Sequence, residues 1–168
     1  MKSVWVTGLG LAWVLAMAVP CAYAAVGEDG PTNAAFPWFG SLKKTEVNVR
    51  SGPGNQYPIL WIYQRANYPV EVLARYDNYY KVRDVEGEEG WTYIGMVSRR
   101  TTGLVGGQSP ANLVRHAAAD SQILARLAPG VVVVLDGCED VAGMGSMCKV
   151  EAPGARGWVS KKNLEMVP

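Results

Sequence analysis

The sequence predicts an all-β protein built from two small β-barrels in tandem behind an N-terminal signal peptide. Apolar and polar residues alternate with a period of two through most of the chain, which is typical of short, half-buried strands. The pattern also repeats itself once further along the chain, which predicts two copies of one unit. Beyond the first 24 residues, no window of about ten residues sustains the apolar stripe of a helix.

The N-terminal segment has the features of a cleaved signal peptide. Lys2 is followed by an uncharged, largely apolar run over residues 4–19, by Pro20, and by the small-x-small triplet Ala22-Tyr23-Ala24. We expect cleavage after Ala24, so that residues 1–24 are removed and the protein is periplasmic or secreted. A retained membrane anchor is the weaker alternative, because a spanning helix needs roughly 20 apolar residues. A lipoprotein is also disfavoured, since Pro20 precedes Cys21 where a small residue is expected.

The charge of the mature chain is balanced. The chain holds 16 Lys and Arg and 15 Asp and Glu, and only Lys2 of these lies in the signal peptide. A neutral balance gives no electrostatic reason to expect nucleic acid or a membrane surface as a partner. We therefore expect neither, and no stable membrane anchor after cleavage.

Cleavage also leaves two cysteines, Cys138 and Cys148. Two cysteines in an exported chain predict a disulfide, with two free thiols as the alternative. A structural zinc site needs four ligands, and the single histidine, His116, cannot complete one. We expect no metal and no cofactor.

The mature chain divides into four segments. We expect a flexible leader over residues 25–41, a first domain over 42–100, a linker over 101–110 and a second domain over 111–168. A cluster of aromatic residues and Pro37 at residues 36–39 interrupts the leader, and we expect it to dock on the first domain. Each domain is expected to contain about five strands, as suits a small barrel.

Turn-forming residues separate the expected strands. Ser51-Gly52-Pro53-Gly54 suggests a type II turn, in which proline fixes one φ angle and a glycine adopts a positive one. Asp77-Asn78 and Glu86-Gly87 mark two further turns.

The internal repeat is carried by four dipeptides of the first copy. Asn48-Val49 and Ile59-Leu60 recur 64 residues later, and Lys81-Val82 and Gly90-Trp91 recur after 68 and 67 residues. Their counterparts are Asn112-Leu113, Ile123-Leu124, Lys149-Val150 and Gly157-Trp158. The small drift in spacing is what insertions in loops between matched strands produce.

The first copy resembles the bacterial SH3-like domain family. The resemblance rests on the segment from Val47 to Gly54, on Tyr57-Pro58-Ile59, and on the later strands that end in Gly90-Trp91. The second copy resembles the family more weakly, because Arg115-His116-Ala117-Ala118 stands where the Gly-Pro-Gly turn is expected. Members of this family often accompany cell-wall hydrolases and bind peptidoglycan or its peptide stems.

The resemblance implies a non-catalytic envelope binding module whose partner is a cell-wall peptide or glycan. One alternative is a protein–protein adaptor that binds an extended segment of another envelope protein, through a barrel edge. A weaker alternative is an enzyme subunit that lacks its catalytic half. No catalytic set is recognisable, because His116 is the only histidine and the acidic neighbours Glu88 and Glu89 are typical of a solvated loop.

Aromatic residues are concentrated in the first copy. Nine Tyr and Trp residues fall between Tyr57 and Tyr93, whereas the second copy holds Trp158 and no tyrosine. A small barrel cannot bury all nine, so several are expected on the surface, where they suit sugars or extended peptides. The alternative is that the tyrosines serve as strand formers or cover neighbouring segments. Trp61 and Tyr63 are expected to share one face. The candidate ligand-binding residues are Arg50, Tyr57, Trp61, Tyr63, Tyr76 and Tyr79, with Arg50 a candidate partner for a peptide carboxylate.

Overall fold

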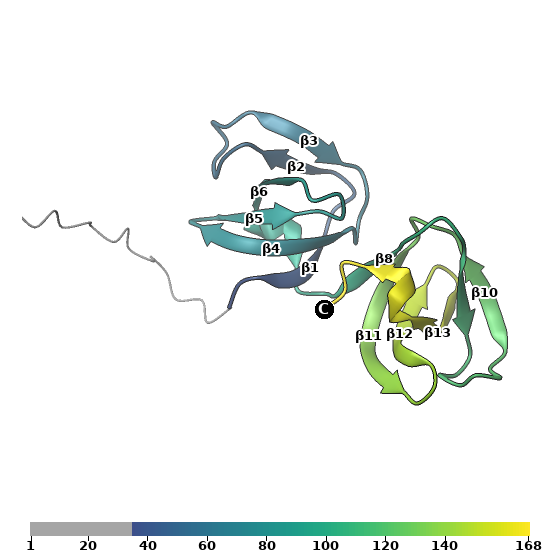
Figure 1. Cartoon of the computed structure of the whole chain (residues 1–168). Coiled ribbons are helices and arrows are strands. Elements are labelled where there is room, and N and C mark those ends of the chain that lie inside the picture. The colour runs from purple at the N-terminus through teal and green to yellow at the C-terminus, as the bar shows by residue number, and fades with distance from the viewer. Residues whose placement is uncertain (1–34) are drawn as a thin grey trace, which may run out of the picture.

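The computed structural model describes residues 35–168 and consists of two seven-stranded antiparallel sheets, one for each repeat (Figure 1). Each sheet curls into a small barrel-like domain, which confirms the predicted fold class. The predicted signal peptide, residues 1–24, and the first part of the predicted leader, residues 25–34, lie outside the described residues.

The first domain contains seven strands and one 3-10 turn. They are β1 (Trp38–Leu42), β2 (Val47–Arg50), β3 (Ile59–Tyr63), β4 (Pro69–Tyr76), β5 (Tyr79–Arg83), β6 (Glu89–Tyr93), η1 (Ile94–Met96) and β7 (Val97–Ser98). Their order in the sheet is β3-β2-β6-β5-β4-β1-β7.

The second domain repeats this arrangement strand for strand. Its elements are β8 (Thr102–Val105), β9 (Ala111–Val114), β10 (Ile123–Leu127), β11 (Val132–Val141), β12 (Gly145–Ala152), β13 (Ala155–Ser160), η2 (Lys161–Asn163) and β14 (Leu164–Glu165). The order β10-β9-β13-β12-β11-β8-β14 matches the first sheet position by position, so β10 corresponds to β3 and β8 to β1.

The structure corrects the predicted leader and linker. Strand β1 lies largely within the expected leader (25–41), and β8 lies within the expected linker (101–110). Neither segment shows a clear period of two, because small residues such as Gly40 and Gly103 replace apolar ones. Each becomes a strand only by pairing with its own domain, β1 with β4 and β7, and β8 with β11 and β14. The short strands β1 and β7, and their counterparts β8 and β14, raise the strand number above the expected five.

The aromatic cluster at the end of the expected leader docks as predicted. Phe36 and Trp38 pack against the first core, and the Trp38 ring meets the Tyr80 ring edge-on with centroids 5.6 Å apart. Within the same stretch, Leu42 is fully buried. This segment is therefore part of the first domain.

Each domain has its own small aliphatic core. The first core is made of Leu42, Val47, Val70, Val72, Val82 and Val97. The second contains Val105, Ala111, Leu113, Leu127, Val133, Cys148, Val150, Ala152, Val159 and Leu164. The predicted alternation is visible in both, because polar residues separate the valines that fill these cores.

The Gly-Trp pair of each repeat has a structural explanation. A Cβ atom on Gly90 would collide with the Val49 side chain, and one on Gly157 would collide with the carbonyl oxygen of Val114. Glycine therefore allows β6 to pass close to β2, and β13 close to β9.

The hairpin turns of the first domain are as predicted at two of three places. Asp77 has φ 47° and Gly87 has φ 87°, as tight turns between β4, β5 and β6 require. The type II turn expected at residues 51–54 is wrong, because Gly54 has no positive φ. Gly52 is instead required for space, since the Tyr57 ring lies directly over it.

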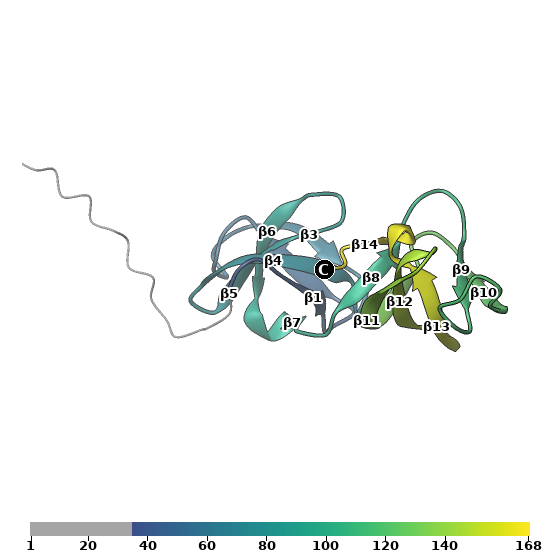
Figure 2. The same ribbon diagram turned by 60° about the horizontal axis from the view of Figure 1, so that its bottom comes forward.

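Only residues 99–101 separate the last strand of the first domain from the first strand of the second (Figure 2). The Arg65 Nη1 also donates a hydrogen bond of 2.7 Å to the carbonyl oxygen of Gly130.

Across residues 35–168, the structure contains no helix with the length and apolar character needed to cross a membrane.

Candidate functional site

Strand alternation divides β5 and β6 into an inner and an outer face. Val82 and Thr92 are buried on the inner face. The outer face carries Tyr79, Lys81 and Arg83 of β5, which lie directly opposite Tyr93, Trp91 and Glu89 of β6. On this outer face Tyr93 is exposed, and the other five side chains are half-buried.

Three tyrosines form a row across the outer face. Tyr76 is paired with Tyr79, and Tyr79 with Tyr93, on three neighbouring strands. Tyr76 is 62% exposed and Tyr93 48% exposed, while Tyr79 is half-buried between them. The Tyr79 and Tyr93 rings meet edge-on with centroids 6.2 Å apart. We call Tyr76, Tyr79 and Tyr93 the tyrosine row.

The loop between β2 and β3 is fastened beside the tyrosine row. Arg50 Nη1 donates hydrogen bonds to the carbonyl oxygens of Tyr57, at 2.8 Å, and Asn55, at 3.3 Å. The Tyr79 hydroxyl donates to Asn55 Oδ1 at 2.9 Å. Tyr57 itself is 39% exposed. The loop is thus held in place by one arginine and one tyrosine of the sheet.

A shallow groove of about 260 Å³ lies between this loop and the end of the row. It is lined by Glu46, Val47, Asn48, Arg50, Asn55, Tyr79, Thr92, Tyr93 and Met96. The groove therefore holds one carboxylate, one guanidinium, two amides and two tyrosine rings. Such a set can bind a short polar chain through hydrogen bonds and aromatic contacts.

A charged network occupies the outer face on the side away from the tyrosine row. Lys81 Nζ lies 2.6 Å from Glu89 Oε2, and Arg83 bridges Glu89 Oε1 at 2.6 Å and Glu71 Oε2 at 3.2 Å. The hydrogen bonds from Lys81 and Arg83 lower the pKa of Glu89, and the bond to Glu89 raises the pKa of Arg83. The network is partly exposed to solvent, which screens it, so its contribution to stability is small.

The bacterial SH3 domain family matches the chain twice, over residues 43–99 and 107–165. The chain belongs to this family. Strands β1 and β8 both lie outside or at the border of the matched regions, although they complete the two SH3 domains. Among curated proteins, none matches the chain.

Among the solved structures similar to the chain are three that share low identity with it. NlpC2 and NlpC1 from Trichomonas vaginalis share 16% and 14% identity with it, at TM-scores of 0.34 and 0.32. These matches cover 77% and 80% of the chain and 48% and 47% of the two Trichomonas proteins. A candidate autolysin from Listeria monocytogenes shares 14% identity at a TM-score of 0.33, over 77% of the chain and 62% of that protein. The chain thus spans about half the length of the Trichomonas proteins.

The structure separates the six predicted site residues into two groups. Arg50, Tyr57 and Tyr79 meet at the loop beside the groove, and Tyr76 extends from there along the tyrosine row. Trp61 and Tyr63 share one face, but it is the face of the buried Val49 and Val47, to which they are paired. These two rings therefore lie away from the tyrosine row.

Tyr63 has a structural role. Its hydroxyl donates a hydrogen bond of 2.7 Å to Asp84 Oδ2, and its ring stacks on Tyr68 with centroids 5.0 Å apart. Asp84 Oδ1 accepts two backbone N–H groups, those of Glu86 and Glu88, and so closes the turn between β5 and β6. Burial, together with the bond to Asp84, raises the pKa of Tyr63 well above its usual range.

Seven of the nine groove residues were missing from the predicted site: Glu46, Val47, Asn48, Asn55, Thr92, Tyr93 and Met96. Tyr93 could have been found from alternation, because it stands two residues beyond Trp91 and opposite Tyr79. Asn55 gave no signal, since its position depends on the fold of the loop between β2 and β3.

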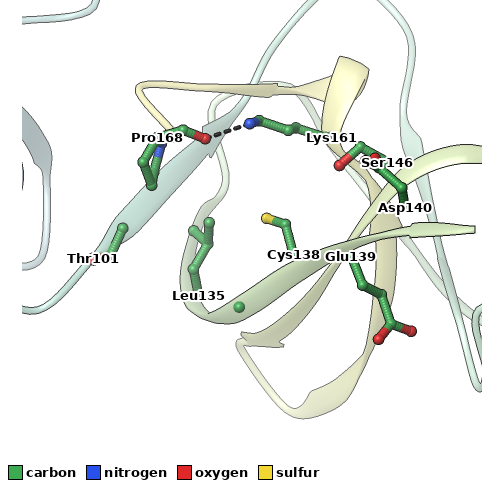
Figure 3. Close-up of a pocket in the computed structure, with 9 residues that line it drawn as sticks. Thr101, Leu135, Cys138, Glu139, Asp140, Ser146, Lys161 and Pro168 are labelled. Carbon is green, nitrogen blue, oxygen red and sulfur yellow. Dashed lines mark hydrogen bonds between the residues drawn. The ribbon is translucent and has the colours of Figure 1, made fainter.

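The second SH3 domain carries a different set of side chains. The predicted disulfide is confirmed between Cys138 and Cys148, which face each other on β11 and β12. Beside it lies a cavity of about 360 Å³ (Figure 3). Figure 3 shows the Cys138 sulfur pointing into this cavity and the Lys161 amino group bonded to the Pro168 carbonyl oxygen. The cavity contains no aromatic side chain. No cluster of three or more His, Cys, Asp and Glu suited to a metal ion occurs in the part of the chain that is described.

Proposed function

We propose that the first SH3 domain binds the peptide stems of cell-wall peptidoglycan through the tyrosine row and the adjoining groove, without catalysing a reaction. The observation that carries the proposal is the exposed row itself. Three tyrosines stand side by side on one scaffold, and the same scaffold lacks them in the second domain. Because both domains have the same strands, strand propensity alone does not explain why only the first carries these tyrosines.

The chemistry of the groove suits a short peptide with charges of both signs. Glu46 and Arg50 line the same groove, so an amine and a carboxylate of one ligand could each meet an opposite charge. Because Arg50 Nη1 already holds the loop, a ligand carboxylate would pair with the remaining guanidinium nitrogens. At about 260 Å³ the groove is smaller than typical enclosed ligand sites, which favours part of an extended chain over a whole small molecule.

The proposal also includes the location of the protein, in the cell envelope or outside the cell. Membership of the bacterial SH3 family and the disulfide both favour the cell envelope or the exterior, because disulfides persist in oxidising compartments. The predicted signal peptide supports a periplasmic or secreted protein.

The test is co-sedimentation of the mature protein with purified peptidoglycan at physiological salt. The informative variant combines Tyr79→Met with Tyr93→Ser, because Met147 and Ser160 stand at the corresponding places of the second domain. We expect retention of the wild type and at least about tenfold weaker retention of the variant. The matched control, Lys149→Ala with Ser160→Ala on the second domain, should be retained like the wild type. Absence of wild-type retention, or equal retention of the tyrosine variant, would overturn the proposal.

A further inference from the structure

Strand β3 exposes an apolar edge. It is the outermost strand of its sheet and, among the described residues, pairs with β2 alone (Figure 1). Three of its five residues are large and exposed: Ile59 by 43%, Leu60 by 51% and Ile62 by 45%. Free backbone groups on an edge strand are a template for another strand, and exposed aliphatic side chains add to the attraction.

The second domain shows how the same edge can be protected. Ile62 is paired with Asn48, and at the corresponding register Arg126 of β10 is paired with Asn112. A charged residue on an edge strand discourages the addition of a further strand. Strand β10 therefore has a protective charged residue, Arg126, at the position where β3 has Ile62. Strand β3 itself contains no charged residue.

The size of the edge decides between two kinds of occupant. Only three side chains, each about half exposed, are available on this edge, whereas a stable interface needs about 800 Å² from each partner, roughly 20–30 residues a side. Two copies joined through β3 would fall well short of that area. A single extended peptide needs only the length of the strand, about 17 Å for five residues, and gains main-chain hydrogen bonds along it.

We propose that the edge of β3 accepts an extended, uncharged segment of another protein as an additional antiparallel strand. Apolar residues at alternate positions of that segment would lie beside Leu60 and Ile62. Because β3 carries no charged side chain, a charged segment would find no ion-pair partner there, and an uncharged segment is favoured. The proposal concerns the backbone edge of the sheet, so it does not depend on peptide-stem binding at the tyrosine row.

The probe is a blocked seven-residue peptide of alternating threonine and valine, titrated into the isotopically labelled mature protein. We expect the backbone amide resonances of residues 59–63 to shift in nuclear magnetic resonance spectra. The same peptide with proline in place of the central valine should produce no shift, because proline removes a donor from the ladder. Absence of shifts in β3, or shifts centred on the tyrosine row, would overturn the proposal.

Two variants complete the experiment. Ile62→Arg introduces the charge that Arg126 supplies on β10 and should weaken peptide binding at least about tenfold. The matched control, Leu124→Arg on β10, should leave peptide affinity unchanged, since Leu124 is also exposed. The melting temperature of each variant reports whether it folds. The variant with Tyr79→Met and Tyr93→Ser should still bind the peptide. Dimerisation of the wild type that Ile62→Arg abolishes would identify a second copy as the occupant and overturn the proposal.

Discussion

The two SH3 domains have the same strand order but present different outer faces. On both, a lysine lies opposite the tryptophan of the Gly-Trp pair: Lys81 opposite Trp91, and Lys149 opposite Trp158. Around this common pair the first domain adds the tyrosine row, whereas the second has Met147 and Ser160 at two of the three places. The comparison separates the residues that build the fold from those that are available for recognition.

An ion pair flanks the common pair in both domains, with its polarity reversed. Arg83 on β5 pairs with Glu89 on β6, and Glu151 on β12 pairs with Arg156 on β13. Both domains thus place opposite charges at these two positions, in either arrangement, because cross-strand attraction has no direction.

The same inner position is filled in two different ways. Tyr80 in the first domain packs on the core and against Trp38, while Cys148 at the matching place of the second domain forms the disulfide. Aromatic packing and a covalent bond are two solutions for a domain too small to hold a large core.

The largest expected loss of stability comes from replacing the glycine of each Gly-Trp pair. Gly157→Ala should cost at least about 3 kcal/mol, because its Cβ would collide with a backbone oxygen that cannot move without the strand. Gly90→Ala should cost less, about 1–3 kcal/mol, because the added Cβ would lie 3.1 Å from the nearest backbone oxygen, that of Arg50, and would mainly displace the Val49 side chain. Differential scanning calorimetry of both variants tests this, with each loss assigned to its own domain. Equal losses would contradict the explanation.

Removal of the disulfide should destabilise the second domain alone, by slightly less than Gly157→Ala does. Reduction, or replacement of Cys138 and Cys148 by alanine, should destabilise the second domain by about 3 kcal/mol, because the unfolded chain loses a closed loop. The first domain, which has no cysteine, should unfold at an unchanged temperature. Chemical denaturation followed through the backbone amide resonances of each domain measures the two separately. A loss shared by both domains would show that they unfold as one unit.

The smallest expected effect concerns the pH dependence of the charged network. Because Lys81 and Arg83 lower the pKa of Glu89, its charge stabilises the folded first domain above the ordinary value of 4.5. That contribution is lost as the pH falls from 4.5 through the lower pKa of the folded state. Glu89→Gln should therefore lower the melting temperature slightly at pH 7 and make no difference near pH 2. A difference that persists at low pH would exclude the charge as its cause.

Much of the fold could be predicted because period-two alternation and turn residues are local signals. The repeat, the disulfide and most strands were visible in this way. Strands β1 and β8 were not, since Trp38–Leu42 and Thr102–Val105 lack the pattern and depend on partners distant in sequence. The site was predicted in part: Arg50, Tyr57, Tyr76 and Tyr79 lie at or beside the groove, whereas Trp61 and Tyr63 face Asp84 and the core.

The sequence by itself determined what each segment can form, because alternation, turn residues and cysteine count act within a few residues of one another. Only the tertiary structure decided which side of each strand is covered. That depends on register: pairing with Val47 and Val49 turns Trp61 and Tyr63 inward, while pairing with Tyr79 places Tyr93 in the exposed row. Strand order in the sheet leaves Ile62 on an open edge, at the place where the second domain has Arg126.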